Sequence, residues 1–357
     1  MAARLTPLGL ARSAEPPKPE MTFPDLLLGP QEAPGPIDVP VRDLGVRVAS
    51  GRPSELTVVT WNIAWGFGWG SEGRQKQAPK SAERLIRTLT EMGSTLANVG
   101  ADLALLQEVD FASARSHDLD EAEIIAKSSG LRYVAPIVTW RSNFVPYPSW
   151  RPSNWWGHIV SGGAILSRHP MTSAFGELLP KPKNQPFWYR PFYPFRFMSC
   201  ASVELPGRAL RVVNVHLEAF DAENRMDQAR RIAARLRSLD SVTLLGGDFN
   251  TVPPEALARH GFVDEPKTDF RSDETMLILR ELLEPSRGTE LGRARSALSD
   301  VMSRARSGQE SFTFPSHAPN RRLDHLFHDE SLVLREARVM KEAGTLSDHL
   351  PVIARFS

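Results

Sequence analysis

The sequence predicts an α/β (α+β) fold in which two mostly antiparallel β-sheets pack face to face, with helices outside them. Short apolar and β-branched runs outnumber the stretches with helical periodicity. These runs do not alternate regularly with helices, as they would in a sheet built from strand–helix–strand units. Several of them follow one another closely, as in hairpins, and this arrangement is typical of a β-sandwich.

The predicted elements follow one another from residue 56 onward. Leu56–Asn62 (LTVVTWN) is a β-branched run typical of a buried strand. Residues 81–99 repeat apolar side chains with a helical period, and Ser81 is a suitable N-cap. Further strands are expected at residues 103–106, 164–166, 201–205, 210–215, 242–245, 322–327, 333–339 and 352–356, and further helices at 225–239 and 274–284.

Residues 1–54 are rich in proline and show no sustained period, so we expect an N-terminal extension before a single domain over residues 55–357. No apolar run approaches the roughly 20 residues of a membrane span. The N-terminus lacks the apolar segment of a secretory signal, and Cys200 is the only cysteine, which excludes an intrachain disulfide. These features predict a cytoplasmic protein without a transmembrane segment, and a monomer is expected.

The net charge of +1 conceals an uneven distribution of charge. Residues 124–203 contain nine Lys and Arg residues but one acid, and they include all four tyrosines and five of the eight tryptophans. The rest of the chain holds 34 basic and 41 acidic residues. The sequence therefore predicts an acidic protein with one basic, aromatic lobe.

Polar side chains stand at the ends of several predicted strands, where an apolar run does not require them. Residues at strand ends are held by a rigid scaffold and can converge from separate strands on one site. They are Asn62 in TWNIAW, Glu108 in LLQEVD, His216 in VNVHLEA, Asp248 and Asn250 in GGDFN, Asp324 in RRLDHLF, and Asp348 and His349 in LSDHLP.

These six motifs offer carboxylates, amides and imidazoles, but no cysteine cluster. Carboxylate and amide oxygens are the ligands that Mg²⁺ or Mn²⁺ prefers. Each motif alone is weak, because an Asp at a strand end is more often a turn residue than a ligand. Six of them together favour a metal-dependent site.

In their order, the six motifs resemble those of the endonuclease/exonuclease/phosphatase superfamily, which has the DNase I-like fold. The resemblance covers about residues 56–356 and extends to the stretches GGAILSRHP and SFTFPSHAP. It implies a four-layer α/β/β/α sandwich. It also implies a metal-dependent phosphoester hydrolase, most simply a phosphodiesterase or nuclease that uses in-line attack of water.

The resemblance further implies a role for each matched residue. Glu108 would be the main ligand of Mg²⁺ or Mn²⁺, helped by Asn62 and Asp348, and the metal would neutralise charge on the phosphoryl oxygens. The other matched residues would carry the catalysis. Asp248 would orient or deprotonate the attacking water, and Asn250 would donate to a phosphoryl oxygen.

Three further residues receive roles in the same way. His349 would contact the scissile phosphate, and Asp324 would fix the tautomer of that imidazole and raise its basicity. His216 would donate to the phosphate or to the leaving oxygen. His325, beside Asp324, stands where the family usually has an aromatic residue, so we interpret it as structural.

Two departures from the family pattern narrow the choice of subfamily. Abasic-site endonucleases carry an acid two residues after the first Asn, where this chain has Ala64, and they use a tyrosine where this chain has His216. The sequence is therefore more similar to the DNase I, sphingomyelinase and tyrosyl-DNA-phosphodiesterase members of the superfamily.

Two proline-studded stretches of the basic lobe, residues 139–158 and 181–197, are expected to be stiff loops. Arg168, Trp188 and Arg190 are the candidate substrate contacts. Cations interleaved with aromatic rings suit unpaired nucleic acid, but they also suit a membrane interface or plain packing into the sandwich. The substrate stays open between a nucleic acid, a phospholipid or sphingomyelin, and another phosphate ester. A catalytically silent binding module is the third alternative.

Overall fold

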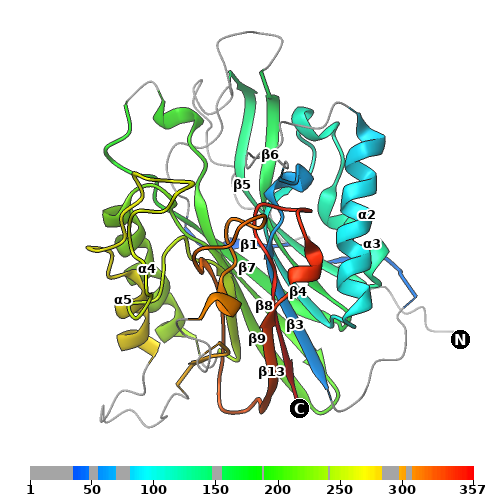
Figure 1. Cartoon of the computed structure of the whole chain (residues 1–357). Coiled ribbons are helices and arrows are strands. Elements are labelled where there is room, and N and C mark those ends of the chain that lie inside the picture. Colours follow the sequence, from blue (N-terminus) through cyan, green and yellow to red (C-terminus); the bar gives the residue numbers. More distant parts are fainter. Residues whose placement is uncertain are drawn as a thin grey trace, which may run out of the picture.

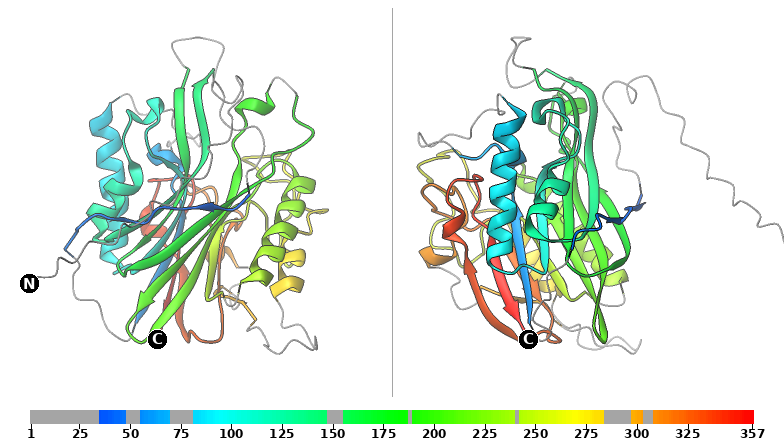
Figure 2. Two further views of the ribbon diagram at one scale, coloured as in Figure 1. Left: turned by 180° about the vertical axis from the view of Figure 1, so that it is seen from behind. Right: turned by 90° about the vertical axis from the view of Figure 1, so that its right-hand side faces the viewer.

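Two seven-stranded sheets pack face to face, and helices cover both outer faces, as Figures 1 and 2 show. The computed structural model describes residues 35–47, 55–69, 81–146, 155–186, 189–239, 242–283, 297–302 and 308–357. Helices α2 and α3 pack on one sheet, and α4 and α5 pack on the other. The predicted four-layer α/β/β/α sandwich of mostly antiparallel sheets is confirmed.

The first sheet has the strand order β1-β7-β8-β9-β10-β12-β11. Only β9 and β10 run parallel, and the other neighbours are antiparallel. Its strands are β1 (Ile37–Asp38), β7 (Met171–Leu179), β8 (Arg196–Leu205), β9 (Arg208–His216), β10 (Leu244–Asp248), β12 (Asp324–His328) and β11 (Ser299–Asp300).

The second sheet has the strand order β13-β14-β3-β4-β6-β5-β2. Here β3 and β4 form the parallel pair. Its strands are β13 (Leu334–Val339), β14 (Val352–Phe356), β3 (Leu56–Asn62), β4 (Leu103–Asp110), β6 (Gly157–Ser167), β5 (Tyr133–Val145) and β2 (Arg42–Asp43).

Four α-helices and several short 3₁₀ turns are described. Ser81 caps α2 by accepting a hydrogen bond from the backbone N–H of Arg84, as the sequence predicts. The helices are α2 (Ala82–Asn98), α3 (Glu121–Ser129), α4 (Ala222–Ser238) and α5 (Thr275–Leu283), and the 3₁₀ turns are η1 (Ala64–Gly66), η2 (Ala114–Ser116), η4 (Arg190–Phe192), η6 (Gln309–Ser311) and η7 (Lys341–Ala343). None of the described helices is long and apolar enough to cross a membrane.

A polar bridge joins the two sheets inside the apolar core. Nε2 of Gln107 on β4 donates to Oδ1 of Asn214 on β9 over 2.7 Å, and both side chains are fully buried. Nδ2 of Asn214 donates in turn to the carbonyl oxygens of Leu106 and Ala164. Because buried polar groups must find partners, these bonds fix how one sheet lies on the other.

A glycine stands where β6 meets the ring of Phe197 from the other sheet. A Cβ at Gly163 on β6 would lie 2.2 Å from the ring of Phe197 on β8 and 2.8 Å from the carbonyl oxygen of Leu106. Backbone atoms cannot move away as a flexible side chain can, so only glycine fits at this position.

The structure changes some expectations about individual elements. The twelve predicted strands and helices are present, and six of them are longer than expected. The strands β1, β2, β5, β7 and β11 and the helix α3 were not predicted. The stretch 139–158 was expected to be a loop, and this is wrong for its described ends, which belong to β5 and β6. Pro136 is tolerated in β5 because β2 pairs only with Tyr133 and Val134. Residues 146 and 155–156 lie outside these strands, and 147–154 lie outside the described residues.

Part of the expected N-terminal extension belongs to the sandwich. Within residues 35–47, β1 pairs with β7 and β2 pairs with β5, so the segment adds an edge strand to each sheet. Residues 1–34 and 48–54 lie outside the described residues, and the domain boundary at residue 55 stays a prediction.

Asn214→Ala tests the polar bridge. The substitution removes the hydrogen bond from Gln107 that links the two sheets and both bonds that Nδ2 of Asn214 donates to carbonyl oxygens, so we expect the free energy of unfolding to fall by about 3 kcal/mol. Urea denaturation measures this loss. Asn98→Ala, at the exposed end of α2, is the control and should change the stability by less than about 0.5 kcal/mol. Equal midpoints for the two variants would contradict the role of the bridge.

Candidate active site

The polar end of the space between the sheets forms the candidate site. The two parallel strand pairs, β3–β4 and β9–β10, bring their carboxyl ends to the same edge of the sandwich. On β9, Leu210 and Val212 face the other sheet, and since side chains alternate along a strand, His216 faces the same way. The same alternation turns Asn62 of β3 and Asp248 of β10 inward.

Glu108 reaches the site through an irregularity of β4. Strict alternation after the inward-facing Gln107 would point Glu108 toward the helices. A bulge between Gln107 and Val109 interrupts the pairing with β6, and Glu108 has φ 53°, in the left-handed region. The bulge therefore lets two consecutive side chains face inward, and its strained backbone is typical of a functional position.

Asp248 lies at the centre of the site and is almost completely buried. Its Oδ2 accepts from Nδ2 of Asn62 over 3.0 Å, and its Oδ1 accepts from the backbone N–H of Asn250 over 2.9 Å. Nε2 of His216 and Nε2 of His349 lie 3.6 Å and 3.7 Å from the same Oδ2. The structure thus brings four of the predicted residues around the carboxylate of a fifth, Asp248.

Gly247 lets the chain reach this position. Its φ of 148° is unfavourable for other residues, and a Cβ there would lie 1.9 Å from the carbonyl oxygen of Val215 on the neighbouring strand. The GGDFN motif therefore needs its second glycine so that β10 can pack beside β9 and carry Asp248 into the site.

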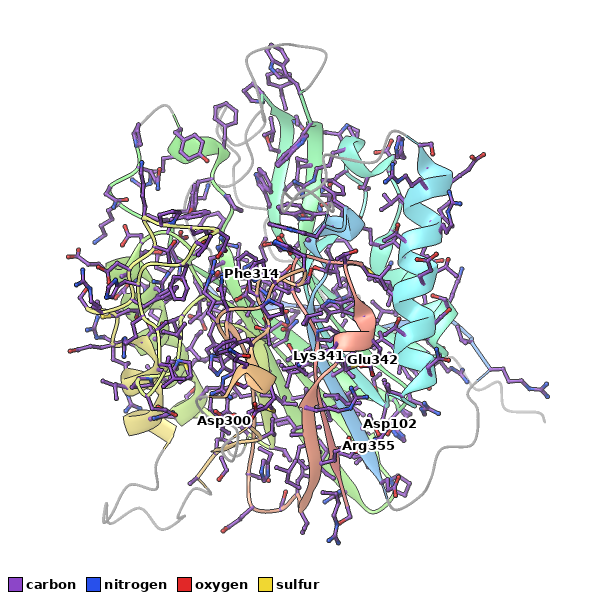
Figure 3. All side chains as sticks on the ribbon, viewed as in Figure 1. Asp102, Asp300, Phe314, Lys341, Glu342 and Arg355 are labelled. Carbon is purple, nitrogen blue, oxygen red and sulfur yellow. The ribbon has the colours of Figure 1, made fainter. Side chains whose placement is uncertain are left out.

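His349 and Asp324 form a buried pair. Nδ1 of His349 lies 2.8 Å from Oδ2 of Asp324, and the ring of Phe314 lies 4.8 Å from the imidazole, in the region labelled in Figure 3. Burial lowers the pKa of His349, but Asp324, Asp248 and Asp348 together outweigh it and raise the pKa to about 10. His349 is therefore a cationic donor at neutral pH.

Burial has the opposite effect on the carboxylates of the site. It raises the pKa of Asp248 to about 6, and it also raises the pKa of Glu108. Burial, and to a lesser degree Glu108, raise the pKa of Asp348 to about 6. These acids lie close enough to repel one another, so a cation would stabilise the site.

Arg196 is a residue of the site that the motifs did not reveal. Its Nη1 lies 2.8 Å from Nε2 of His216, and its Nε lies 3.7 Å from Oε2 of Glu218. Burial and the cation of Arg196 hold the pKa of His216 well below its usual range, so His216 is neutral. Arg196 begins β8, and Phe197 pairs with His216, so the register of β8 on β9 places it here. From the sequence, only the basic character of its segment is evident.

The three expected substrate contacts do not come together in the described site. Arg168 forms an ion pair with Asp102 over 3.0 Å, and Asp102 precedes β4, whereas Glu108 lies near the other end of that strand. Figure 3 shows Asp102 toward the opposite end of the strands from Phe314. Six residues of strand span about 20 Å, so Arg168 is not at the site. Arg190 is exposed on η4, and Trp188 lies outside the described residues.

Two sets of side chains offer metal ligands. Among the described residues, Asp248, Asp324 and His349 each place one ligand atom within 4.8 Å of the others. In this set the protonated His349 is a donor to Asp324 rather than a ligand. Glu108, Asp348 and Asn62 offer oxygens alone, and the Oδ1 of Asn62, which accepts from the N–H of Ala64, keeps a second lone pair. This second set fits a hard divalent cation better.

Comparisons with known proteins identify a family and a fold. A model of the endonuclease/exonuclease/phosphatase family matches residues 59–349. Among solved structures, a protein of that description from Beutenbergia cavernae is 19% identical with a TM-score of 0.52, and the match covers 85% of this chain and 71% of that chain.

Two other solved structures show the same fold with 15% identity, and each match covers 85% of this chain and 99% of the other. They are the mannosyl-6-phosphatase of Bacteroides thetaiotaomicron, with a TM-score of 0.53, and TDP2 of D. rerio complexed with a single-strand DNA product, with a TM-score of 0.51. No curated protein matches this chain.

Asp324→Asn tests the charge of His349. Loss of the nearest carboxylate removes the strongest stabilisation of the imidazolium, so we expect the pKa of His349 to fall from about 10 toward neutral. Nitrogen chemical shifts of the imidazole measure the titration in metal-free protein. Glu336→Gln on the exposed β13 is the control and should leave the titration unchanged.

The same pair has a predictable effect on stability. The folded pKa of His349 is raised above its unfolded value, so the pair stabilises the fold fully below about pH 6.5, and this contribution is lost as the pH rises to about 10. A His349 that titrates near pH 6.5 in the unmodified protein would contradict the assignment.

Proposed function

The chain belongs to the endonuclease/exonuclease/phosphatase family, and we propose that it is a divalent-metal-dependent phosphodiesterase that cleaves a nucleic-acid strand by attack of water. The family match confirms the resemblance seen in the six motifs. The observation that carries the proposal is the buried Asp248, surrounded by Asn62, Asn250, His216 and His349. Such an arrangement offers one base and several donors to a single phosphoryl group.

Asp248 is the proposed general base. Two amide groups hold its oxygens, and burial raises its pKa to about 6, which is close to the range in which a carboxylate can take a proton from water. A base must lie within hydrogen-bond reach of its water, and the two contacts to Asn62 and Asn250 fix the carboxylate for this purpose. The described site requires no serine or cysteine nucleophile.

The donors around Asp248 would stabilise the charge that develops on the phosphate. The imidazolium of His349 is held by Asp324, and the guanidinium of Arg196 lies on the other side, against His216. His349 is buried and Arg196 is largely buried, so their charges act in a low-dielectric environment, where they are stronger than in water. Neutral His216 lies between Arg196 and Asp248, and its Nε2 accepts a hydrogen bond from the guanidinium, which it holds in the site.

A divalent cation completes the proposed site. Glu108, Asn62 and Asp348 would hold Mg²⁺ or Mn²⁺, which when bound supplies charge neutralisation at the phosphoryl oxygens. Glu108 is turned inward by its bulge, and its repulsion of Asp348 raises the pKa of that acid, so the two carboxylates are suited to share one cation.

The choice of a nucleic-acid substrate rests on the basic, aromatic segment around the site. Arg196 comes from that segment, and so do Trp140 and Trp156, whose rings surround the guanidinium of Arg115. Cations among aromatic rings suit a strand with unpaired bases. The similar structures include one crystallised with a single-strand DNA product and one named as a sugar phosphatase, so the fold alone does not choose between these substrates.

Asp248→Asn tests the catalytic role. Purified protein with Mg²⁺ should hydrolyse bis-p-nitrophenyl phosphate, and EDTA should abolish this activity. Since the amide cannot accept a proton, we expect kcat to fall by about 100-fold or more, as measured by p-nitrophenolate release. Glu91→Gln on the exposed face of α2 is the control and should keep full activity. Activity that survives both EDTA and Asp248→Asn would contradict the mechanism.

A parallel assay tests the substrate class. Single-stranded DNA, duplex DNA, RNA and sphingomyelin vesicles are incubated with the protein and Mg²⁺ under the same conditions. We expect the highest kcat/KM on a single strand, because only unpaired bases can stack on aromatic side chains. Turnover of the vesicles alone would assign the protein to the lipid phosphodiesterases instead.

A further inference from the structure

Trp65 stands in a strained position three residues after Asn62. It belongs to η1 and has φ 53° and ψ 28°, and the preceding Ala64 also has a positive φ of 46°. A left-handed backbone is unusual for an aromatic residue and persists only where the surrounding structure enforces it. The fold therefore holds the indole of Trp65 in one place at the expense of backbone strain.

The side chain of Arg115 enforces this position. Its Nε and Nη2 donate to both carboxylate oxygens of Asp110 over 2.9 Å, and neither side chain of the pair is exposed. The guanidinium carbon lies 4.1 Å from the ring centroid of Trp65 and 4.4 Å from that of Trp156. Arg115 is thus a rigid support against the ring of Trp65.

Two routes along the chain place this support beside the catalytic residues. Trp65 follows Asn62, whose Oδ1 accepts from the N–H of Ala64. Asp110, which holds Arg115, comes two residues after Glu108. Three residues of chain reach at most about 11 Å, so the indole lies near the Asn62 and Glu108 side of the site.

Packing alone does not explain Trp65. It is half-buried and belongs to none of the described apolar clusters, whereas Trp61 and Ile63 are fully buried in the core under α2. Its ring contacts those of Phe67 and Trp156, with centroids 5.7 Å and 5.9 Å away, but part of it stays open to solvent. A rigid, partly exposed aromatic ring in a loop at a catalytic edge has the features of a binding residue.

We propose that Trp65 forms a stacking subsite for an unpaired nucleobase next to the scissile phosphate, with Arg115 as the positioning residue beneath it. The inference rests on the proposed function and names the part of the substrate that the site recognises. Arg115 is buried and its charge is balanced by Asp110, so this subsite offers a flat ring and no free cation for an anionic headgroup. A base has the matching flat surface.

The experiment compares two strands that differ only in their bases. A fluorescent single-stranded oligonucleotide and an abasic sugar–phosphate strand of the same length are titrated with the full chain in EDTA, so that no hydrolysis occurs. Fluorescence anisotropy gives both affinities. We expect the base-bearing strand to bind about 10-fold more tightly, and Trp65→Ala to remove this preference while the affinity for the abasic strand stays the same.

Further variants separate stacking from general damage. Trp65→Phe keeps a ring and should retain most of the preference, and Arg115→Lys, which cannot make the two-pronged contact to Asp110, should weaken it. Phe144→Ala removes another ring of the basic segment, which is 42% exposed and contacts Trp155, and should leave the preference intact.

Two results would overturn the subsite. One is an equal affinity of the unmodified protein for both strands, and the other is a preference that survives Trp65→Ala. The hydrolysis of bis-p-nitrophenyl phosphate is measured separately. If that hydrolysis is present without the base preference, the stacking subsite fails and the phosphodiesterase proposal stands. If the preference is present without hydrolysis, the phosphodiesterase proposal fails and the stacking subsite stands.

Discussion

The hydrogen bond between Gln107 and Asn214 is the constraint on which the arrangement of the site depends. It joins the middle strands of two sheets whose other contacts in the core are largely apolar, and apolar side chains can slide past one another at small cost. A buried amide pair cannot slide, because each misplaced group would lose its partner. Glu108 follows Gln107 and His216 comes two residues after Asn214, so the bond sets the distance between the two halves of the site.

The site is therefore an extension of the sandwich core rather than an addition to it. The same alternation that buries Val58, Val212 and Leu244 between the sheets turns Asn62, His216 and Asp248 inward at the strand ends. Carboxylates in such a position are poorly solvated, and this raises the pKa of Asp248 and Asp348. The buried acids of the site therefore reduce the stability of the fold, a cost that is common for catalytic centres.

Sequence patterns predicted the layers and the strand-end residues, because both depend on local order along the chain. The inward turn of Glu108 and the place of Arg196 were not predictable in this way, since they depend on a bulge in β4 and on the register of β8 against β9. Arg168 was assigned to the site because it lies in a basic segment, but the antiparallel pairing of β6 with β4 carries it to the opposite edge. The amino-acid composition shows that a segment is basic, but the pairing of its strands determines where each of its residues lies in the fold.

The segment that contains β1 and β2 has a consequence for solubility. Figure 2 shows it crossing the sandwich, and its two short strands pair with β7 and β5, each the last long strand of its sheet on that side. An open strand edge offers unpaired N–H and C=O groups to any other extended chain, which leads to aggregation. Pro40 stands between the two strands and cannot donate a hydrogen bond. One stretch of chain thus covers part of one edge of each sheet.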